Sequence, residues 1–125
     1  MKAAQWIFRI AGTYGVLVMT PLYFLERTFT DSVHPEFYYG FIGVGLAWQV
    51  LFFILAADPV RYRVFMIPAI LEKIGYGAAT FWLFFAGRAE PSILLGGGID
   101  WLFVALFLWA YVQTGRRLHS QPAMA

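Results

Sequence analysis

The segment VFMIPAILEKIGYGAATFWLFF (64–85) decides the fold, because it is long and apolar and yet contains Glu72 and Lys73 near its middle. About 20 apolar residues in a helix span the hydrocarbon core of a bilayer, which is about 30 Å thick. A charged residue at the centre of such a helix costs roughly 2.5–3.5 kcal/mol on insertion scales. The segment is therefore predicted to be a membrane-spanning helix whose two charges face the interior of a bundle, where they have partners or a function.

Three more apolar runs of similar length accompany this segment, at residues 6–25, 37–57 and 93–112. The chain of 125 residues is 61% hydrophobic and 13% charged, whereas soluble domains are about 25% charged. Short connections force consecutive helices to run antiparallel. The sequence therefore predicts one all-α integral membrane domain over residues 1–125, a four-helix transmembrane bundle with an up-down-up-down course.

Prolines indicate where some of these helices begin and bend. Pro35 suits the first position of the second helix, and Asp58 with Pro59 predicts that the third helix begins at Pro59. Pro21 is expected to kink the first helix, because it frees a backbone carbonyl. The residues after Gln113 are expected to be frayed.

Lys and Arg residues are distributed unevenly between the two ends of the predicted bundle. Arg27 and Arg88 lie at one end. The other end has six such residues, Lys2, Arg9, Arg61, Arg63, Arg116 and Arg117. Cytoplasmic loops carry an excess of Lys and Arg, so we expect both termini in the cytoplasm. The net charge of +2 is then explained by topology, and no nucleic-acid partner is predicted.

The buried charges, and polar residues at matching depths in other helices, are the candidate ligand-binding residues. Side chains of adjacent residues point about 100° apart on a helix, so Glu72 and Lys73 are expected to have different partners. Gln5, Arg9 and Thr13 form an i, i+4 stripe that is expected to face inward. Depths calculated from a rise of about 1.5 Å per residue predict two clusters. The inner cluster contains Arg9, Gln49, Glu72 and Tyr76, and the outer cluster contains Lys73 and Asp100.

Both clusters have a structural alternative. Buried ion pairs such as Lys73 with Asp100 can do no more than fix helix register and partner choice. Two carboxylates and a lysine could instead bind a polar headgroup, a quinone carbonyl or a proton. No spacing of catalytic residues is met, so no catalytic residue is predicted.

Several kinds of site are not expected. The chain has no cysteine, and its histidines, His34 and His119, lie in a loop and in the tail, so neither a metal nor a haem cofactor is predicted. The small residues of the helices are expected to pack closely against neighbouring helices. These are Gly40, Gly43 and Ala47 in the second helix, Gly75, Gly77, Ala78 and Ala79 in the third, and Gly96, Gly97 and Gly98 in the fourth.

Two blocks, DPVRYRVFMIPAILEKIGYG (58–77) and GGGIDWLFVALF (96–107), resemble the DoxX-like group of small four-helix bacterial membrane proteins. The resemblance implies a four-helix fold in the bacterial inner membrane. The namesake of this largely uncharacterised group is associated with a membrane quinone-reducing complex. No catalytic residue is established for its short members, and the cysteines of some members are missing here.

The leading functional hypothesis is a non-enzymatic membrane protein that binds a lipid-like or quinone-like molecule. Its predicted partners are membrane lipids, and further copies of the chain or the subunits of a larger membrane complex. One alternative is a small proton-coupled transporter with Glu72 and Asp100 as carriers, and another is a membrane enzyme of the sterol-isomerase type. A binder needs a closed apolar cavity that ends at Glu72, a transporter a wet path through both leaflets, and an isomerase an acid–base pair across one cavity.

Overall fold

The structure, a computed structural model of the chain, describes residues 1–30 and 33–120, which form helices and no strands. Four long helices carry the fold, namely α1 (Lys2–Met19), α3 (Pro35–Ala57), α4 (Met66–Phe85) and α5 (Ile93–Ser120). Three short elements join them, the 3₁₀ helices η1 (Thr20–Phe24) and η2 (Arg63–Phe65) and the single turn α2 (Glu26–Phe29). The predicted all-α bundle of four helices is confirmed.

The helix ends follow local chemistry in two of the four predicted places. The second helix, α3, begins at Pro35 with Glu36 in its first turn, where an acidic side chain meets the positive end of the helix dipole. Helix α1 ends at Met19, and the chain continues through Pro21 as the 3₁₀ helix η1. Proline lacks the N–H that an α-helix needs there.

Two predicted helix ends are wrong. Residues 59–62 form a turn, and α4 begins only at Met66 after η2, so the third helix does not start at Pro59. The predicted fraying after Gln113 is also absent from the described residues, because α5 continues to Ser120. No proline interrupts α5, and the hydroxyl of Thr114 donates to the carbonyl of Ala110 within the same helix.

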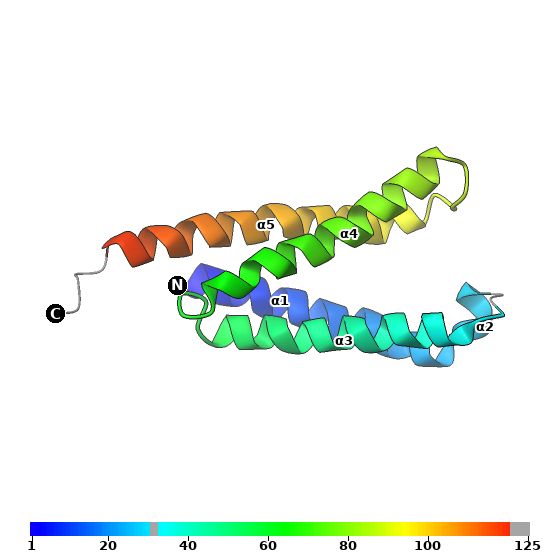
Figure 1. Cartoon of the computed structure of the whole chain (residues 1–125), viewed down its shortest axis with the longest axis horizontal. Helices are drawn as coiled ribbons and strands as arrows, with labels where there is room; N and C mark the ends of the chain where they lie inside the picture. Colours follow the sequence, from blue (N-terminus) through cyan, green and yellow to red (C-terminus); the bar gives the residue numbers. More distant parts are fainter. Residues whose placement is uncertain (31–32, 121–125) are drawn as a thin grey trace.

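The helices pack as two hairpins. Helix α1 contacts α3 extensively and α4 contacts α5 to the same extent, whereas α1 meets α5 over a smaller surface and α3 barely touches α4. Figure 1 shows the chain running to and fro along one axis, with residue 1 and the end of α5 at the same end of the bundle. At that end α3 passes through a short turn into α4, and the two helices then separate towards α2. The bundle is therefore a wedge that is closed at the terminal end.

Aromatic rings close the terminal end of the wedge. Phe8 of α1, Phe52 of α3 and Phe107 of α5 are fully buried. The Phe8 and Phe107 ring centres lie 4.6 Å apart, and those of Phe52 and Phe107 lie 5.3 Å apart. Such contacts are typical of stacked and edge-on aromatic pairs. One residue from each of three helices thus joins the two hairpins at this level.

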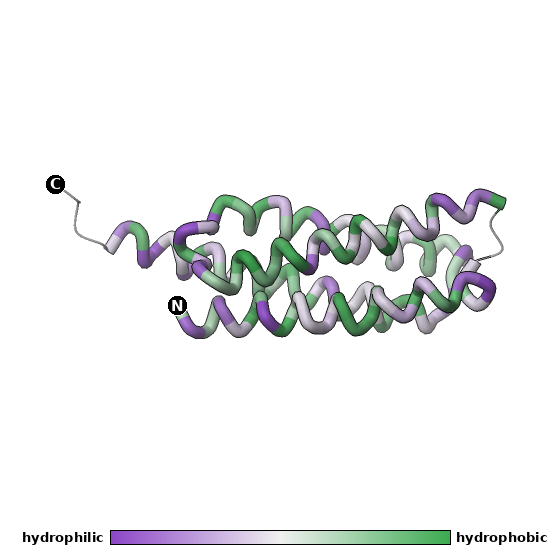
Figure 2. The backbone as a smooth tube through the Cα atoms, turned by 90° about the horizontal axis from the view of Figure 1, so that it is seen from below, coloured by the Kyte–Doolittle hydropathy of each residue, from purple (hydrophilic) through white to green (hydrophobic). Residues whose placement is uncertain are grey.

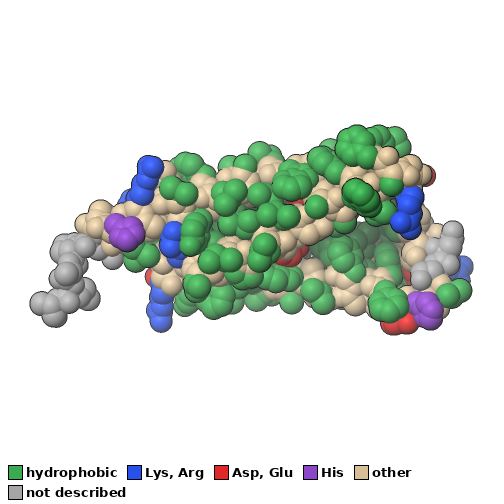
Figure 3. Space-filling model, turned by 45° about the horizontal axis from the view of Figure 1, so that its top comes forward, with side chains coloured by type: hydrophobic (Ala, Val, Ile, Leu, Met, Phe, Trp, Pro, Cys, Tyr) green, Lys and Arg blue, Asp and Glu red, His purple; other side chains and the backbone are tan. Residues whose placement is uncertain are grey.

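The outer surface of the bundle is apolar. All four helices, with η1 and η2 included, are long and apolar enough to cross a membrane, and only 28–33% of the most apolar stretch of each is buried in the bundle. Hydrophilic residues gather near both ends of the bundle in Figure 2, and hydrophobic side chains cover the face shown in Figure 3. An apolar belt of this extent needs lipid around it. The chain is a multi-pass membrane protein.

The small residues do not all pack as predicted. Gly40, Gly43 and Ala47 on α3 and Gly75 on α4 are exposed. A Cβ atom added at Gly40 or Gly75 would meet nothing within 4 Å. The prediction of close packing is therefore wrong for these four residues, because α3 and α4 diverge where they lie. The prediction is confirmed elsewhere, at Gly77, where a Cβ would lie 2.9 Å from Trp101 Nε1, and at Gly97, where it would overlap Thr80 Oγ1.

Candidate functional site

A cavity of about 120 Å³ lies between the two hairpins, where the wedge opens. All four long helices contribute to its wall. The polar and small residues of the wall are Tyr14 and Gly15 of α1, Gly45 and Gln49 of α3, Glu72, Lys73 and Tyr76 of α4, and Gly96 and Asp100 of α5. Figure 3 shows this face of the molecule hollowed between the helix pairs, towards its right-hand end. Five of the six predicted site residues thus line one space.

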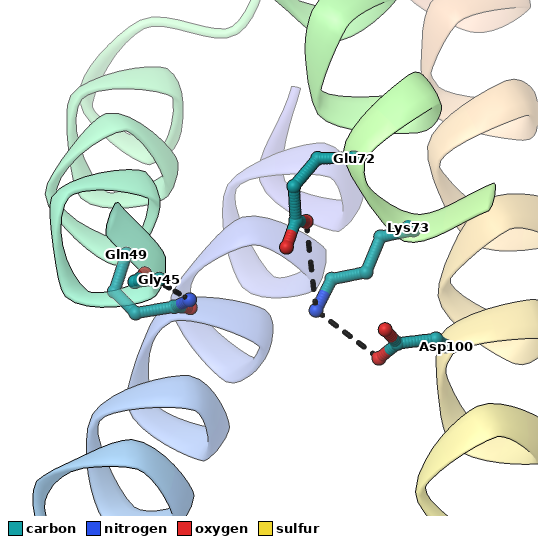
Figure 4. A network of polar contacts seen from close by, with 5 residues as sticks. All are labelled: Gly45, Gln49, Glu72, Lys73 and Asp100. Atoms are coloured by element: carbon teal, nitrogen blue, oxygen red, sulfur yellow. Dashed lines mark hydrogen bonds and ion pairs between the residues drawn. The ribbon is translucent and has the colours of Figure 1, made fainter. Parts of the chain in front are cut away.

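Three of these residues form a charged group at the base of the cavity. The ammonium nitrogen of Lys73 donates to Asp100 Oδ1 at 3.2 Å, and Glu72 Oε2 lies 3.9 Å from the same nitrogen. The side chains of Lys73, Asp100 and Glu72 are 5%, 8% and 23% exposed. Figure 4 shows Lys73 Nζ between the two carboxylates. The predicted Lys73–Asp100 ion pair is confirmed.

The predicted separation of Glu72 from Lys73 is wrong. The two backbone directions differ as expected, but the four-carbon stem of lysine is long and flexible. It carries Nζ back across the face of α4 to within 3.9 Å of Glu72 Oε2. The two clusters predicted from helix depth are therefore one cluster, with Lys73 shared between two acids.

Aromatic rings support the ammonium group from the side of the closed end. Lys73 Nζ lies 5.5 Å from the ring centre of Phe52 and 5.4 Å from that of Phe103. Cations within about 6 Å of an aromatic ring centre gain electrostatic attraction, and the gain is larger away from water. Lys73 thus sits at the boundary between the aromatic core and the cavity.

Gln49 brings an unpartnered acceptor to the cavity. It is 3% exposed, and its Nε2 donates to the carbonyl of Gly45 one turn earlier at 2.7 Å. Because that carbonyl can only accept, the amide orientation is determined, and Oε1 is the atom left without a hydrogen bond. Gly15 permits this arrangement, since a Cβ there would overlap Gln49 Oε1. Figure 4 shows Gln49 pointing from α3 towards the charged group.

Glu72 provides a second acceptor of the same kind. Its Oε2 is buried and has no hydrogen-bond partner. The 3.9 Å to Lys73 Nζ is an ionic contact that is too long for a hydrogen bond. Buried acceptors without donors are rare in native structures, since leaving one unpaired costs about 1–3 kcal/mol. Two such acceptors, Gln49 Oε1 and Glu72 Oε2, belong to residues of one cavity wall.

Two tyrosines complete the wall. Tyr76 was predicted, and its ring stacks on Phe41 of α3 with ring centres 6.2 Å apart. Tyr14 of α1 was missed, and its ring lies 5.7 Å from that of Phe103. The sequence held a signal for Tyr14, which lies one turn after Ala11 and directly before Gly15. Both belong to the buried face of α1, which consists of Ala4, Phe8, Ala11, Gly12 and Gly15. This apolar stripe has the i, i+3/i+4 spacing of a core-facing helix.

The prediction that Arg9 belongs to the site is wrong. Arg9 is exposed and absent from the cavity wall, and its guanidinium carbon lies 5.4 Å from the ring centre of Trp6. The inward stripe was assigned to Gln5, Arg9 and Thr13, but the buried face of α1 begins one residue earlier, at Ala4 and Phe8. One residue corresponds to about 100° of helix rotation, which moves Arg9 to the outside.

The electrostatics of the cavity favour a positively charged or hydrogen-bond-donating guest. Two carboxylates and one ammonium give the group a formal charge of −1, and both unpartnered atoms are acceptors. In residues 1–30 and 33–120, no three His, Asp or Glu side chains come close enough together to hold a metal ion. The chemistry that the wall offers is therefore ionic and hydrogen-bonded recognition of a polar group.

Comparison with models of known protein families, with curated proteins and with solved structures finds no match to this chain. The resemblance of residues 58–77 and 96–107 to the DoxX-like group stays a prediction.

Proposed function

We propose that this protein binds a lipid-like or quinone-like amphiphile whose polar part lies beside Glu72 in the interhelical cavity. One observation carries the proposal. A cavity bounded by all four helices contains two buried acceptors, Gln49 Oε1 and Glu72 Oε2, without donors. A guest that donates hydrogen bonds offsets the cost of burying them. Service as a subunit of a larger membrane complex, or as a homo-oligomer, is compatible with this role.

The geometry favours a binder over the two alternatives. A transporter needs a path through both leaflets, and the rings of Phe8, Phe52 and Phe107 pack together at the terminal end. An isomerase needs an acid and a base that face each other across a substrate, but Glu72 and Asp100 both contact the same ammonium group. Glu72 lines a cavity bounded by all four long helices. Lys73 in the same wall lies 5.5 Å from the ring centre of Phe52 and 5.4 Å from that of Phe103, an arrangement that supports a binding pocket.

We place the protein in the bacterial inner membrane with both termini in the cytoplasm. The uneven distribution of Lys and Arg supports this orientation. It fits the position of residue 1 and the end of α5 at one end of the bundle (Figure 1). The DoxX-like resemblance supports the choice of membrane.

Cysteine labelling tests the orientation, because the chain has no cysteine of its own. We expect Glu90→Cys, between α4 and α5, to react with a membrane-impermeant maleimide added to intact cells. Ser120→Cys, at the end of α5, is expected to react only after the cells are opened. The reverse pattern would contradict the orientation. A third position predicted to label from outside, Ser32, lies outside the described residues.

Glu72→Gln tests the binding function. The amide keeps the shape of the side chain but removes the charge, and hydrogen bonds to charged groups are about twice as strong as neutral ones. We expect the amount of co-purifying amphiphile per protein, measured by mass spectrometry, to fall about tenfold. Glu90→Gln, which removes an exposed carboxylate, serves as the control and should retain the wild-type amount. Unchanged retention with a lowered melting temperature would make Glu72 structural.

A further inference from the structure

A groove on the outer surface adjoins the cavity. It lies between α3 and α4, and its wall includes Val44 and Trp48 of α3 and Gly75 and Ala79 of α4. Four residues line both spaces, namely Phe41, Gly45, Glu72 and Tyr76. Because α3 and α4 barely touch, this is the side of the bundle on which the cavity meets the lipid.

The size of the cavity limits what it can hold. An apolar cavity of about 150 Å³ holds a molecule the size of benzene, and this cavity measures about 120 Å³. A polar head and its first few carbon atoms therefore fit, but a long chain does not. An apolar route for the chain of a bound amphiphile begins at the residues that the two spaces share, in the groove between α3 and α4.

The wall specifies the head. Gln49 Oε1 and Glu72 Oε2 need donors, and the charged group carries a formal −1. A protonated primary amine supplies three N–H donors and one positive charge. An alcohol supplies one donor and no charge, and a carboxylate supplies no donor and carries a negative charge. Lys73 is already engaged by Asp100 at 3.2 Å, which leaves Glu72 as the acid available to a guest.

We propose, on the basis of the binding function above, that the guest is an amphiphile with a protonated amine as its head. The ammonium group lies between Gln49 and Glu72, and the alkyl chain leaves sideways between α3 and α4, past Gly75. The absence of a side chain at Gly75 keeps this route open.

Four probes with the same chain length test the head in phosphatidylcholine nanodiscs that contain the full-length protein. They are dodecylamine, dodecyltrimethylammonium, dodecanol and dodecanoate, titrated calorimetrically at pH 7 with empty nanodiscs subtracted. Dodecylamine is charged at this pH, like a lysine side chain. We expect it to bind at least about tenfold more tightly than dodecanol and dodecanoate. The trimethylammonium probe, which has the charge but no N–H donor, should fall in between.

Two variants assign the contacts. Gln49→Leu should weaken the binding of dodecylamine and leave the binding of dodecyltrimethylammonium unchanged, because only the amine donates to Gln49 Oε1. Glu72→Gln should weaken the binding of both cations. Glu90→Gln should leave both affinities unchanged. If a variant does not fold, the ranking of the four probes on the wild-type protein still decides the head.

A matched pair of variants tests the route of the chain. Gly75→Leu puts a side chain into the groove, whereas Gly40→Leu puts the same side chain at a position of α3 that lines neither the groove nor the cavity. Both glycines have open space at Cβ, so both variants should fold. We expect Gly75→Leu to weaken the binding of dodecylamine about tenfold and to leave the binding of short-chain butylamine unchanged. The Gly40→Leu protein should bind dodecylamine as the wild type does.

The outcomes separate this inference from the binding function itself. Saturable binding of dodecanol or dodecanoate that equals the binding of dodecylamine would overturn the amine head and leave the binding function standing. Equal affinity of Gly75→Leu and Gly40→Leu for dodecylamine would overturn the route. If none of the four probes binds saturably, the binding function and this inference both fail.

Discussion

Lys73→Met should destabilise the protein by about 3–5 kcal/mol, the range found when one partner of a buried ion pair is removed. Lys73 Nζ contacts Asp100 Oδ1 at 3.2 Å and Glu72 Oε2 at 3.9 Å. Methionine fills a similar volume, but it leaves two acids with no cation in a site that is 8% exposed at Asp100. Desolvated carboxylates without a partner are costly. Thermal unfolding in detergent, followed by far-UV circular dichroism, measures the loss.

The double variant Lys73→Met with Asp100→Leu should recover much of that stability. It removes both members of the pair at the base of the cavity and leaves Glu72, whose side chain is the most exposed of the three at 23%. Lys2→Met, at an exposed lysine at the start of α1, is the control and should change little. Losses that simply add in the double-mutant cycle would show that Lys73 and Asp100 do not interact energetically.

Gly97→Ala and Gly98→Ala should have effects of opposite sign, although the two residues are neighbours on α5. A Cβ at Gly97 would overlap Thr80 Oγ1 and lie 2.9 Å from Thr80 Cβ. Thr80 is 1% exposed and donates to the carbonyl of Gly77, so it has little freedom to move. Forcing α4 and α5 apart should cost about 1–3 kcal/mol.

At Gly98 the added Cβ would meet nothing within 4 Å. Alanine is a better helix former than glycine by about 0.5–1 kcal/mol. We therefore expect a small rise in the melting temperature for Gly98→Ala and a clear fall for Gly97→Ala. Equal melting temperatures for the two variants would mean that α4 and α5 are not in close contact at Thr80.

The existence of the helices could be predicted because it is a local property. The backbone N–H and C=O groups of a run of about 20 apolar residues cannot remain without hydrogen bonds in lipid. The run must therefore form a helix wherever its neighbours lie. The boundaries were less predictable. Residues 59–62 form a turn and not the first turn of α4. The start of α4 depends on how the α3–α4 connection folds, which is not a local property.

Part of the site could be predicted from depth. Lys73 and Asp100 lie on different helices at compatible levels, and a charge in lipid needs a partner, so their pairing followed from position alone. The rotation of α1 could not be derived in this way. Two stripes of α1 competed for the interior, and the one with Phe8 and Gly15 is buried because small and aromatic side chains fit against α3 and α5.

The sequence by itself determined that the chain crosses a membrane with four helices and that Lys73 and Asp100 form a pair. Only the tertiary structure decided that α1 pairs with α3 and α4 with α5, and that the two hairpins diverge from an aromatic closure. Pairing of helices depends on how well side chains far apart in the chain fit together, and hydrophobic periodicity does not predict that fit. The cavity is a consequence of the divergence. Gln49, Glu72, Lys73, Tyr76 and Asp100 therefore form one site, which the helix depths alone had divided into two.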